Sequence, residues 1–206
     1  MTTQAHTQST STLSHLWIHA TVFGALWGGL EITLGTLLHA LRIPFSGVWM
    51  AAAGICILVA GLTVFPIRGF ALRVGVVCML LKLISPGVVI VLPMISIFME
   101  AAIVEMVMFN GKTTRFRAIL AGTLGCLSVI VQAMTYYYFI FGWDLLHIYL
   151  VLLEKAVLWL GAPESWGWIA VALVILLICL VGAIAGSYGM TLGKAVIRLQ
   201  KEEADA

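Results

Sequence analysis

Four ionisable residues lie inside long apolar runs of this sequence: Glu31, Lys82, Glu100 and Glu105. A charged side chain is costly in the hydrocarbon of a bilayer, so such residues usually pair with one another or mark a functional site. As structural contacts, Lys82 can pair with Glu31 or Glu100. Glu105 can likewise pair with Arg73. The functional alternatives are a ligand contact for Glu31 and acid/base chemistry for Glu100 and Glu105.

Polar and aromatic residues are expected at the same depth as Glu31. A small heterocyclic ligand needs stacking surfaces and a few polar groups that orient it. We therefore predict a substrate site made of Glu31, His39, Trp49, Ser96, Gln132, Tyr136 and Trp166, with Met50, Pro93, Thr135 and Trp168 nearby. Trp and Tyr also gather at membrane interfaces as anchors. Trp143, Trp166 and Trp168 fit that alternative as well.

The composition indicates an integral membrane protein. Of the 206 residues, 62% are hydrophobic and 10% are charged, whereas a soluble domain averages about 25% charged residues. The net charge of +2 is too small to indicate nucleic-acid binding. The four cysteines stand singly in apolar runs without a CxxC motif, which is typical of small buried hydrophobes. No metal or cofactor is predicted.

The stretch from Phe70 to Phe109 fixes the expected topology. As one continuous helix it would be ~60 Å long at about 1.5 Å per residue, and the hydrocarbon core is only ~30 Å thick. Ser85-Pro86-Gly87 supplies the break, because proline disfavours helical geometry at the preceding residue. We therefore predict a helical hairpin, with this turn on one side of the membrane and the basic residues that follow Phe109 on the other.

The remaining apolar runs complete an all-α, polytopic membrane protein with a six-helix transmembrane bundle. The spans are predicted at about 15–41, 46–65, 70–84, 88–109, 118–141 and 166–196. Residues 1–14 form a polar tail without the basic region or cleavage site of a signal peptide, so the first run is expected to be a retained span. Residues 199–206 form a charged tail.

The segment 144–161 decides between six spans and seven. It is barely long enough to cross, and it carries Asp144, His147, Glu154 and Lys155. With six spans, the positive-inside rule is satisfied because most basic residues then lie near the cytoplasm. Those residues are Arg68, Arg73, Lys112, Arg115, Arg117, Lys194, Arg198 and Lys201. We therefore predict an additional outer interfacial helix at 144–161. Both termini are expected in the cytoplasm, and the protein in the cell membrane of a prokaryote.

Small residues repeat every fourth position on the first span. Thr21, Ala25 and Gly29 form one such series, and Gly24 and Gly28 form another. Small side chains let helices approach closely, which is a main source of helix association in lipid. We predict partner docking through Thr21, Ala25, Gly28 and Gly29, with packing inside the bundle as the alternative. The last span carries a similar series, namely Gly182, Gly186, Gly189 and Gly193.

Six short spans and a small-residue pattern at Ala25-Leu26-Trp27-Gly28-Gly29 resemble the substrate-binding (S) components of energy-coupling factor vitamin transporters. In that family, AxxxA motifs on the first helix dock the transmembrane coupling subunit, and the ligand site lies in the outer half. Gly29 replaces the second alanine here. The chain lacks the N-terminal Met-His start of the cobalt and nickel members, and its connection at 42–45 is short for the family.

The resemblance implies a substrate-capture subunit for a vitamin-like heterocycle, powered by separate ATPase and coupling subunits. The sequence contains no P-loop, GxSxG or HExxH motif, so no catalytic residue is predicted. The alternatives are an intramembrane enzyme acting on a lipid or isoprenoid, and a non-catalytic assembly subunit of a larger membrane complex.

Overall fold

The structure, a computed structural model, describes residues 2–43, 45–84, 91–108, 113–142 and 166–205, and these form helices joined by short connections without a strand. The helices are α1 (Thr2–Ala40), α2 (Ser46–Val64), α3 (Phe70–Lys82), α4 (Val91–Met108), α5 (Arg115–Phe141) and α7 (Trp166–Ala204). The predicted all-α class is confirmed for this part of the chain.

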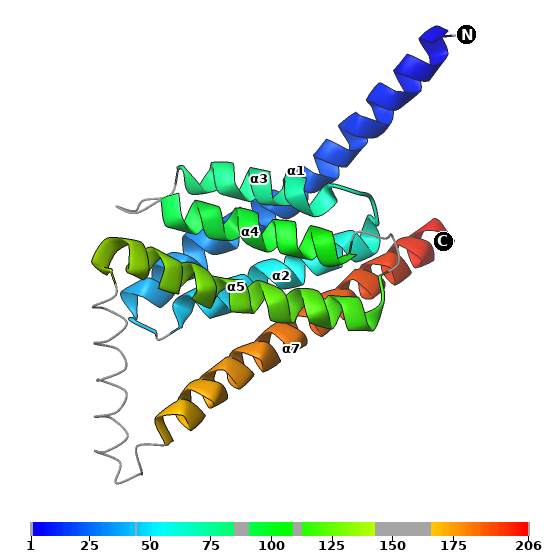
Figure 1. Cartoon of the computed structure of the whole chain (residues 1–206). Coiled ribbons are helices and arrows are strands. Elements are labelled where there is room, and N and C mark those ends of the chain that lie inside the picture. Colours follow the sequence, from blue (N-terminus) through cyan, green and yellow to red (C-terminus); the bar gives the residue numbers. More distant parts are fainter. Residues whose placement is uncertain (1, 44, 85–90, 109–112, 143–165, 206) are drawn as a thin grey trace.

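Successive helices run in alternating directions through one bundle (Figure 1). The N- and C-termini lie toward the same end of it, as do the connection between α2 and α3 and the start of α5, and the beginning of α1 projects beyond the other helices. We call this the terminal end. At the opposite end, α1, α3 and α5 finish and α2, α4 and α7 begin. We call it the cavity end, because a cavity between the helices lies toward it.

Five helices are long and apolar enough to cross a membrane: α1, α2, α4, α5 and α7. Only 17% of the apolar window of α7 is buried inside the bundle, and large side chains such as Leu173, Leu177 and Leu180 are exposed along it. Such surfaces suit contact with lipid rather than water. The protein is therefore a helical membrane protein. The remaining helix, α3, is shorter, and it carries Arg73 and Lys82.

Helix α2 lies at the centre of the bundle, with 67% of its apolar window buried. Its residues Ile55 and Leu58 are fully buried, as are Trp27 of α1 and the α3 residues Phe70 and Val74. The indole of Trp27 lies where a side chain at Gly54 would be, so a glycine at this point of α2 lets the two helices meet.

The glycine series of the last span packs inside the bundle. A methyl group on Gly182 or Gly186 would collide with backbone atoms of Gly122 or Ala118 on α5. Farther along α7, Gly193 faces Ala60 and Thr63 of α2 in the same way. Backbone-to-backbone contact of this kind requires glycine, because no other residue leaves the space. This series is therefore an internal packing surface.

The helix bounds differ from the predicted spans mainly at the chain ends. Helix α1 begins at Thr2, so the predicted polar tail continues the first helix, and α7 runs to Ala204, beyond the predicted end at 196. Polar residues extend both helices past the apolar runs. Hydropathy predicts only the length of helix in contact with lipid, whereas backbone hydrogen bonding can continue the helix beyond it. The predicted turn at Ser85-Pro86-Gly87 and the predicted interfacial helix at 144–161 lie outside the described residues.

Candidate functional site

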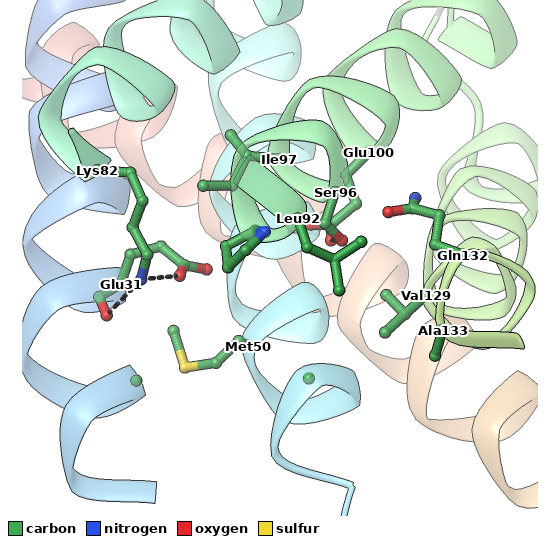
Figure 2. Close-up of a pocket in the computed structure, with 13 residues that line it drawn as sticks. Glu31, Met50, Lys82, Leu92, Ser96, Ile97, Glu100, Val129, Gln132 and Ala133 are labelled. Carbon is green, nitrogen blue, oxygen red and sulfur yellow. Dashed lines mark hydrogen bonds and ion pairs between the residues drawn. The ribbon is translucent and has the colours of Figure 1, made fainter. Parts of the chain in front are cut away.

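A cavity of about 180 Å³ lies between the helices, toward the cavity end of the bundle. Its walls come from five helices, with Gly35 near the end of α1, Gly47 in the first turn of α2 and Leu92 in the first turn of α4 (Figure 2). Its lining is Glu31, Gly35, Gly47, Met50, Lys82, Leu92, Pro93, Ser96, Ile97, Glu100, Val129, Gln132 and Ala133. Apolar walls with a few converging polar groups are the usual construction of a small-molecule site.

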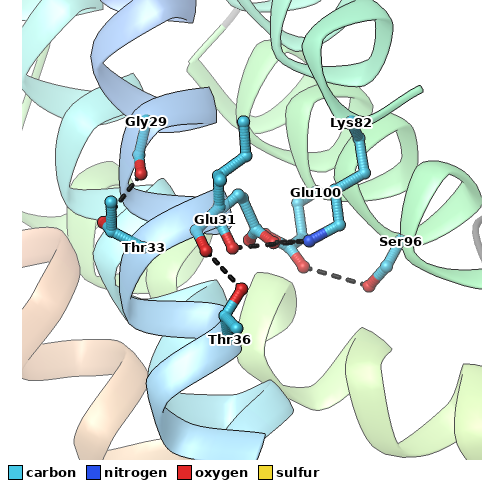
Figure 3. Close-up of polar contacts among 8 residues, drawn as sticks. Gly29, Glu31, Thr33, Thr36, Lys82, Ser96 and Glu100 are labelled. Atoms are coloured by element: carbon cyan, nitrogen blue, oxygen red, sulfur yellow. Dashed lines mark hydrogen bonds and ion pairs between the residues drawn. The ribbon is translucent and has the colours of Figure 1, made fainter. Parts of the chain in front are cut away.

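An ion pair joins α1 to α3 at one wall of the cavity (Figure 3). The Nζ atom of Lys82 lies 3.1 Å from Oε2 of Glu31 and 3.4 Å from the backbone oxygen of the same residue. Glu31 is only 8% exposed. Of the two partners predicted for Lys82, the structure therefore selects Glu31. Because the amine occupies one carboxylate oxygen, Glu31 is an ion-pair residue as well as part of the cavity lining.

Glu100 forms the second carboxyl group of the cavity. It is 4% exposed, and Ser96, one turn earlier on α4, donates a hydrogen bond from Oγ to its Oε1 at 3.1 Å. Within the described chain, no Lys or Arg nitrogen lies within 4.0 Å of this carboxyl group. A buried carboxyl group without a cationic partner is costly, so it is a strong candidate for a ligand contact.

Gln132 of α5 extends toward Glu100 from the opposite wall (Figure 2). Its amide nitrogen and oxygen are both buried, and neither has a hydrogen-bond partner among the described residues. The large majority of buried polar side-chain atoms in proteins are hydrogen-bonded, so an amide with both ends unpaired needs an explanation. A ligand or water molecules in the cavity would satisfy both atoms.

Three predicted substrate residues lie elsewhere. Trp49 is 49% exposed and contributes to an apolar groove between α2 and α7, together with Phe45 and Leu173. Trp166 is 54% exposed at the start of α7, and the ring of Tyr136 packs against Tyr137. None of the three lines the cavity. The side chain of His39 lies outside the described part of the structure. The structure thus brings together Glu31, Ser96 and Gln132 from the predicted set.

Glu105 lies toward the terminal end, near Arg68 and Thr113. It accepts hydrogen bonds from the backbone nitrogens of Gly69 and Ala71, at 2.5 and 2.9 Å, at the start of α3. Free N–H groups at a helix start favour an acidic partner. The predicted Glu105–Arg73 pair is therefore wrong. The guanidinium of Arg73 instead lies over the ring of Trp17 and donates to the backbone oxygen of Arg68.

The small residues of α1 divide between two faces. A methyl group on Gly24 or Gly28 would collide with Val77 or Leu81 of α3, so these glycines are internal. Gly28 is thus wrongly assigned to the docking face. Thr21, Ala25 and Gly29 are exposed, and a methyl group on Gly29 would meet no atom within 4 Å.

The cavity also contains residues that the sequence reasoning missed, among them Leu92, Ile97, Val129 and Ala133. Helical spacing could have found some of them, because Leu92 and Ser96, like Ser96 and Glu100, are four residues apart on one face of α4. On α5, Val129 and Ala133 are likewise four residues apart, and Gln132 follows Val129 by three.

Fold and site together define the class of the protein, a polytopic helical membrane protein with a cavity of apolar walls and a few buried polar groups toward one end of its bundle. Comparison with family models, with curated proteins and with solved structures finds no match to this chain. No group of three His, Cys, Asp or Glu side chains in the described ranges is arranged to hold a metal ion. The residues of the cavity are therefore the basis on which function is inferred.

Proposed function

We propose that the protein captures a small molecule in the membrane as the substrate-binding subunit of an importer. The cavity is the observation that carries this proposal. It combines apolar walls with the buried carboxyl group of Glu100 and the unpaired amide of Gln132. Unpaired buried polar groups are costly in an empty protein, and a ligand that pairs with them gains that free energy on binding.

In this proposal six helices cross the membrane and both termini are cytoplasmic. The alternating directions of the helices support it (Figure 1). Basic residues support it too, because Arg68, Arg115, Lys194 and Arg198 belong to the terminal end, and positive residues favour the cytoplasm. The cavity then opens toward the outside, where an importer must collect its substrate. A prokaryotic cell membrane is the proposed location.

Uptake against a concentration gradient needs an energy source, and the sequence has no nucleotide-binding motif. We therefore include a membrane coupling subunit and ATPases in the proposal, as in energy-coupling factor transporters. The exposed small residues Thr21, Ala25 and Gly29 are the proposed docking surface. They lie on α1 between its start and Glu31, so a bound partner helix would lie nearer the cytoplasm than the cavity.

The enzyme alternative receives less support from the geometry. Glu100 and Glu105, the proposed acid/base pair, line different cavities, and Glu105 is engaged by two backbone N–H groups. An acid and a base that act on one substrate must both lie within hydrogen-bonding reach of it.

The proposal is tested by purifying the protein in mild detergent from the membranes of its own cells. We expect an ATPase and a second membrane protein to co-purify, and Gly29→Leu to remove both. Gly29 is exposed, so this variant should fold as the parent does. A parent that purifies without an ATPase, under conditions that keep other membrane complexes intact, would contradict the proposed importer.

A further inference from the structure

We propose that the cavity selects a small nitrogen base, an amidine or amine with at least two N–H donors and an apolar body. Glu100 and Gln132 are the residues that recognise those donors. The inference rests on the proposed capture function and names the chemical class of the substrate. It also changes the residue expected to contact the ligand from Glu31 to Glu100.

The cavity offers more acceptors than donors. Among the described residues, Oε2 of Glu100, Oε1 of Glu31 and Oε1 of Gln132 receive no hydrogen bond. The hydroxyl of Ser96 and the amine of Lys82 already donate to the two carboxyl groups, which leaves the amide nitrogen of Gln132 as the donor atom without a partner in the described part of the lining. A ligand that matches this lining must donate more hydrogen bonds than it accepts.

The charge of the lining points the same way. Two carboxyl groups, Glu31 and Glu100, face the cavity with a single amine, Lys82, and that amine lies 3.1 Å from Glu31. Glu100 is therefore the carboxyl group without a cation. In a low-dielectric site an ionic hydrogen bond is stronger than in water, so a ligand that brings positive charge to Glu100 gains most. An acidic ligand would find no cationic partner at Glu100 among the residues described.

Gln132 adds a second contact opposite Glu100 (Figure 2). Whichever way its amide is turned, it presents one donor nitrogen and one acceptor oxygen, both unpaired among the described residues. A protonated base with two or more N–H groups can donate one of them to the Gln132 oxygen and another to Glu100. A base that keeps a nitrogen lone pair can instead accept from the Gln132 amide nitrogen while its N–H binds Glu100. The remaining walls, including Met50, Leu92 and Ile97, are apolar and suit a hydrocarbon body.

The size of the cavity limits the ligand. A volume of about 180 Å³ holds a body of roughly one ring with a short substituent. Lining residues Gly35 and Gly47 have no side chain that narrows it. Among the described lining residues there is no aromatic ring, so recognition depends on hydrogen bonds and shape rather than on stacking.

The test compares two probes of equal shape and opposite charge, benzamidine and benzoate. Binding to the full-length protein in detergent is measured by calorimetry. We expect benzamidine to bind at least tenfold more tightly than benzoate. Replacing one ionic hydrogen bond should weaken benzamidine by roughly ten- to a hundred-fold in Glu100→Gln. Gln132→Met should weaken it as well.

Glu105→Gln is the matched control, because it makes the same chemical change at a buried glutamate outside the cavity. Its affinity for benzamidine should equal that of the parent. If Glu100→Gln does not fold, Gln132→Met and Ser96→Ala replace it. Benzoate binding as tightly as benzamidine, no binding of either probe, or an unchanged affinity in the cavity variants would each overturn the inference.

Different results would contradict the nitrogen-base inference and the proposed function. An acidic small molecule that co-purifies with the protein would overturn the nitrogen-base inference and leave substrate capture intact. A protein that purifies without any bound small molecule and without an ATPase would overturn the function itself.

Discussion

The amine of Lys82 and the carboxylate of Glu31 meet at 3.1 Å, with side chains that are 16% and 10% exposed. This contact attaches the last turn of the short helix α3 to α1, beside the cavity. A charge pair in such a setting is costly to break from one side, because the remaining charge stays buried without a partner.

We therefore expect Lys82→Met to lower the free energy of unfolding by about 3 kcal/mol. Glu31→Gln should be similarly destabilising. Thermal unfolding in detergent provides the measurement. The double variant should be less destabilised than the sum of the two single variants, since removing both charges leaves none unpaired. Additive effects would show that the two side chains do not depend on each other.

The hydrogen bonds from Gly69 and Ala71 to Glu105 predict a second stabilising contact, at the start of α3. Glu105→Ala should leave two backbone N–H groups without their acceptor and cost about 1–3 kcal/mol. Hydrogen exchange should rise at the start of α3 and stay unchanged at Lys82. Glu203→Ala, an exposed position on α7, serves as the control. Equal stability of the two variants would refute the capping role.

The contact between α5 and α7 predicts that an added methyl group destabilises the protein at Gly186 but not at Gly29. Gly186→Ala places a methyl group against backbone atoms of Ala118, and backbone cannot move aside as a flexible side chain can. We expect a loss of about 1–3 kcal/mol, or failure to fold. Gly29→Ala meets open space and should fold at least as well as the parent. The melting temperatures of the two variants are the measurement, and equal values would contradict the prediction.

Labelling with an impermeant thiol reagent tests the proposed topology. Cysteines at Thr113 and Lys201 should be shielded in intact cells, and one at Arg42 should react. The native cysteines lie in helices and are buried or half-buried, so their background should be small. Labelling at Lys201 but not at Thr113 would mean that the chain between α5 and α7 crosses the membrane.

Several features of this fold follow directly from the sequence. Apolar runs and the breaks between them predict α2 and α3 to within about two residues, because hydrophobic length and helix-breaking residues are local properties. The pair of Glu31 and Lys82 was among the predicted alternatives, since few partners exist for a charge at membrane depth.

Other features depend on how each helix is oriented about its own axis in the bundle, and local sequence patterns do not determine that orientation. Trp49 and Gln132 were both predicted to face the ligand, yet only Gln132 lines the cavity. Rotation also separates Gly28, which packs against α3, from the exposed Gly29. Glu105 was assigned to Arg73 by charge alone, whereas the start of α3 provides nearer donors in its backbone. These outcomes are set by packing between distant segments.

The central claim is that the cavity beside Glu100 and Gln132 holds a small molecule. Native mass spectrometry of the intact protein, released gently from detergent, tests it most directly. We expect one bound non-lipid molecule per protein in the parent and in Glu105→Gln, and a large loss of it in Glu100→Gln and Gln132→Met. A parent that carries lipid alone, or a bound molecule that the two cavity variants retain in full, would contradict the account.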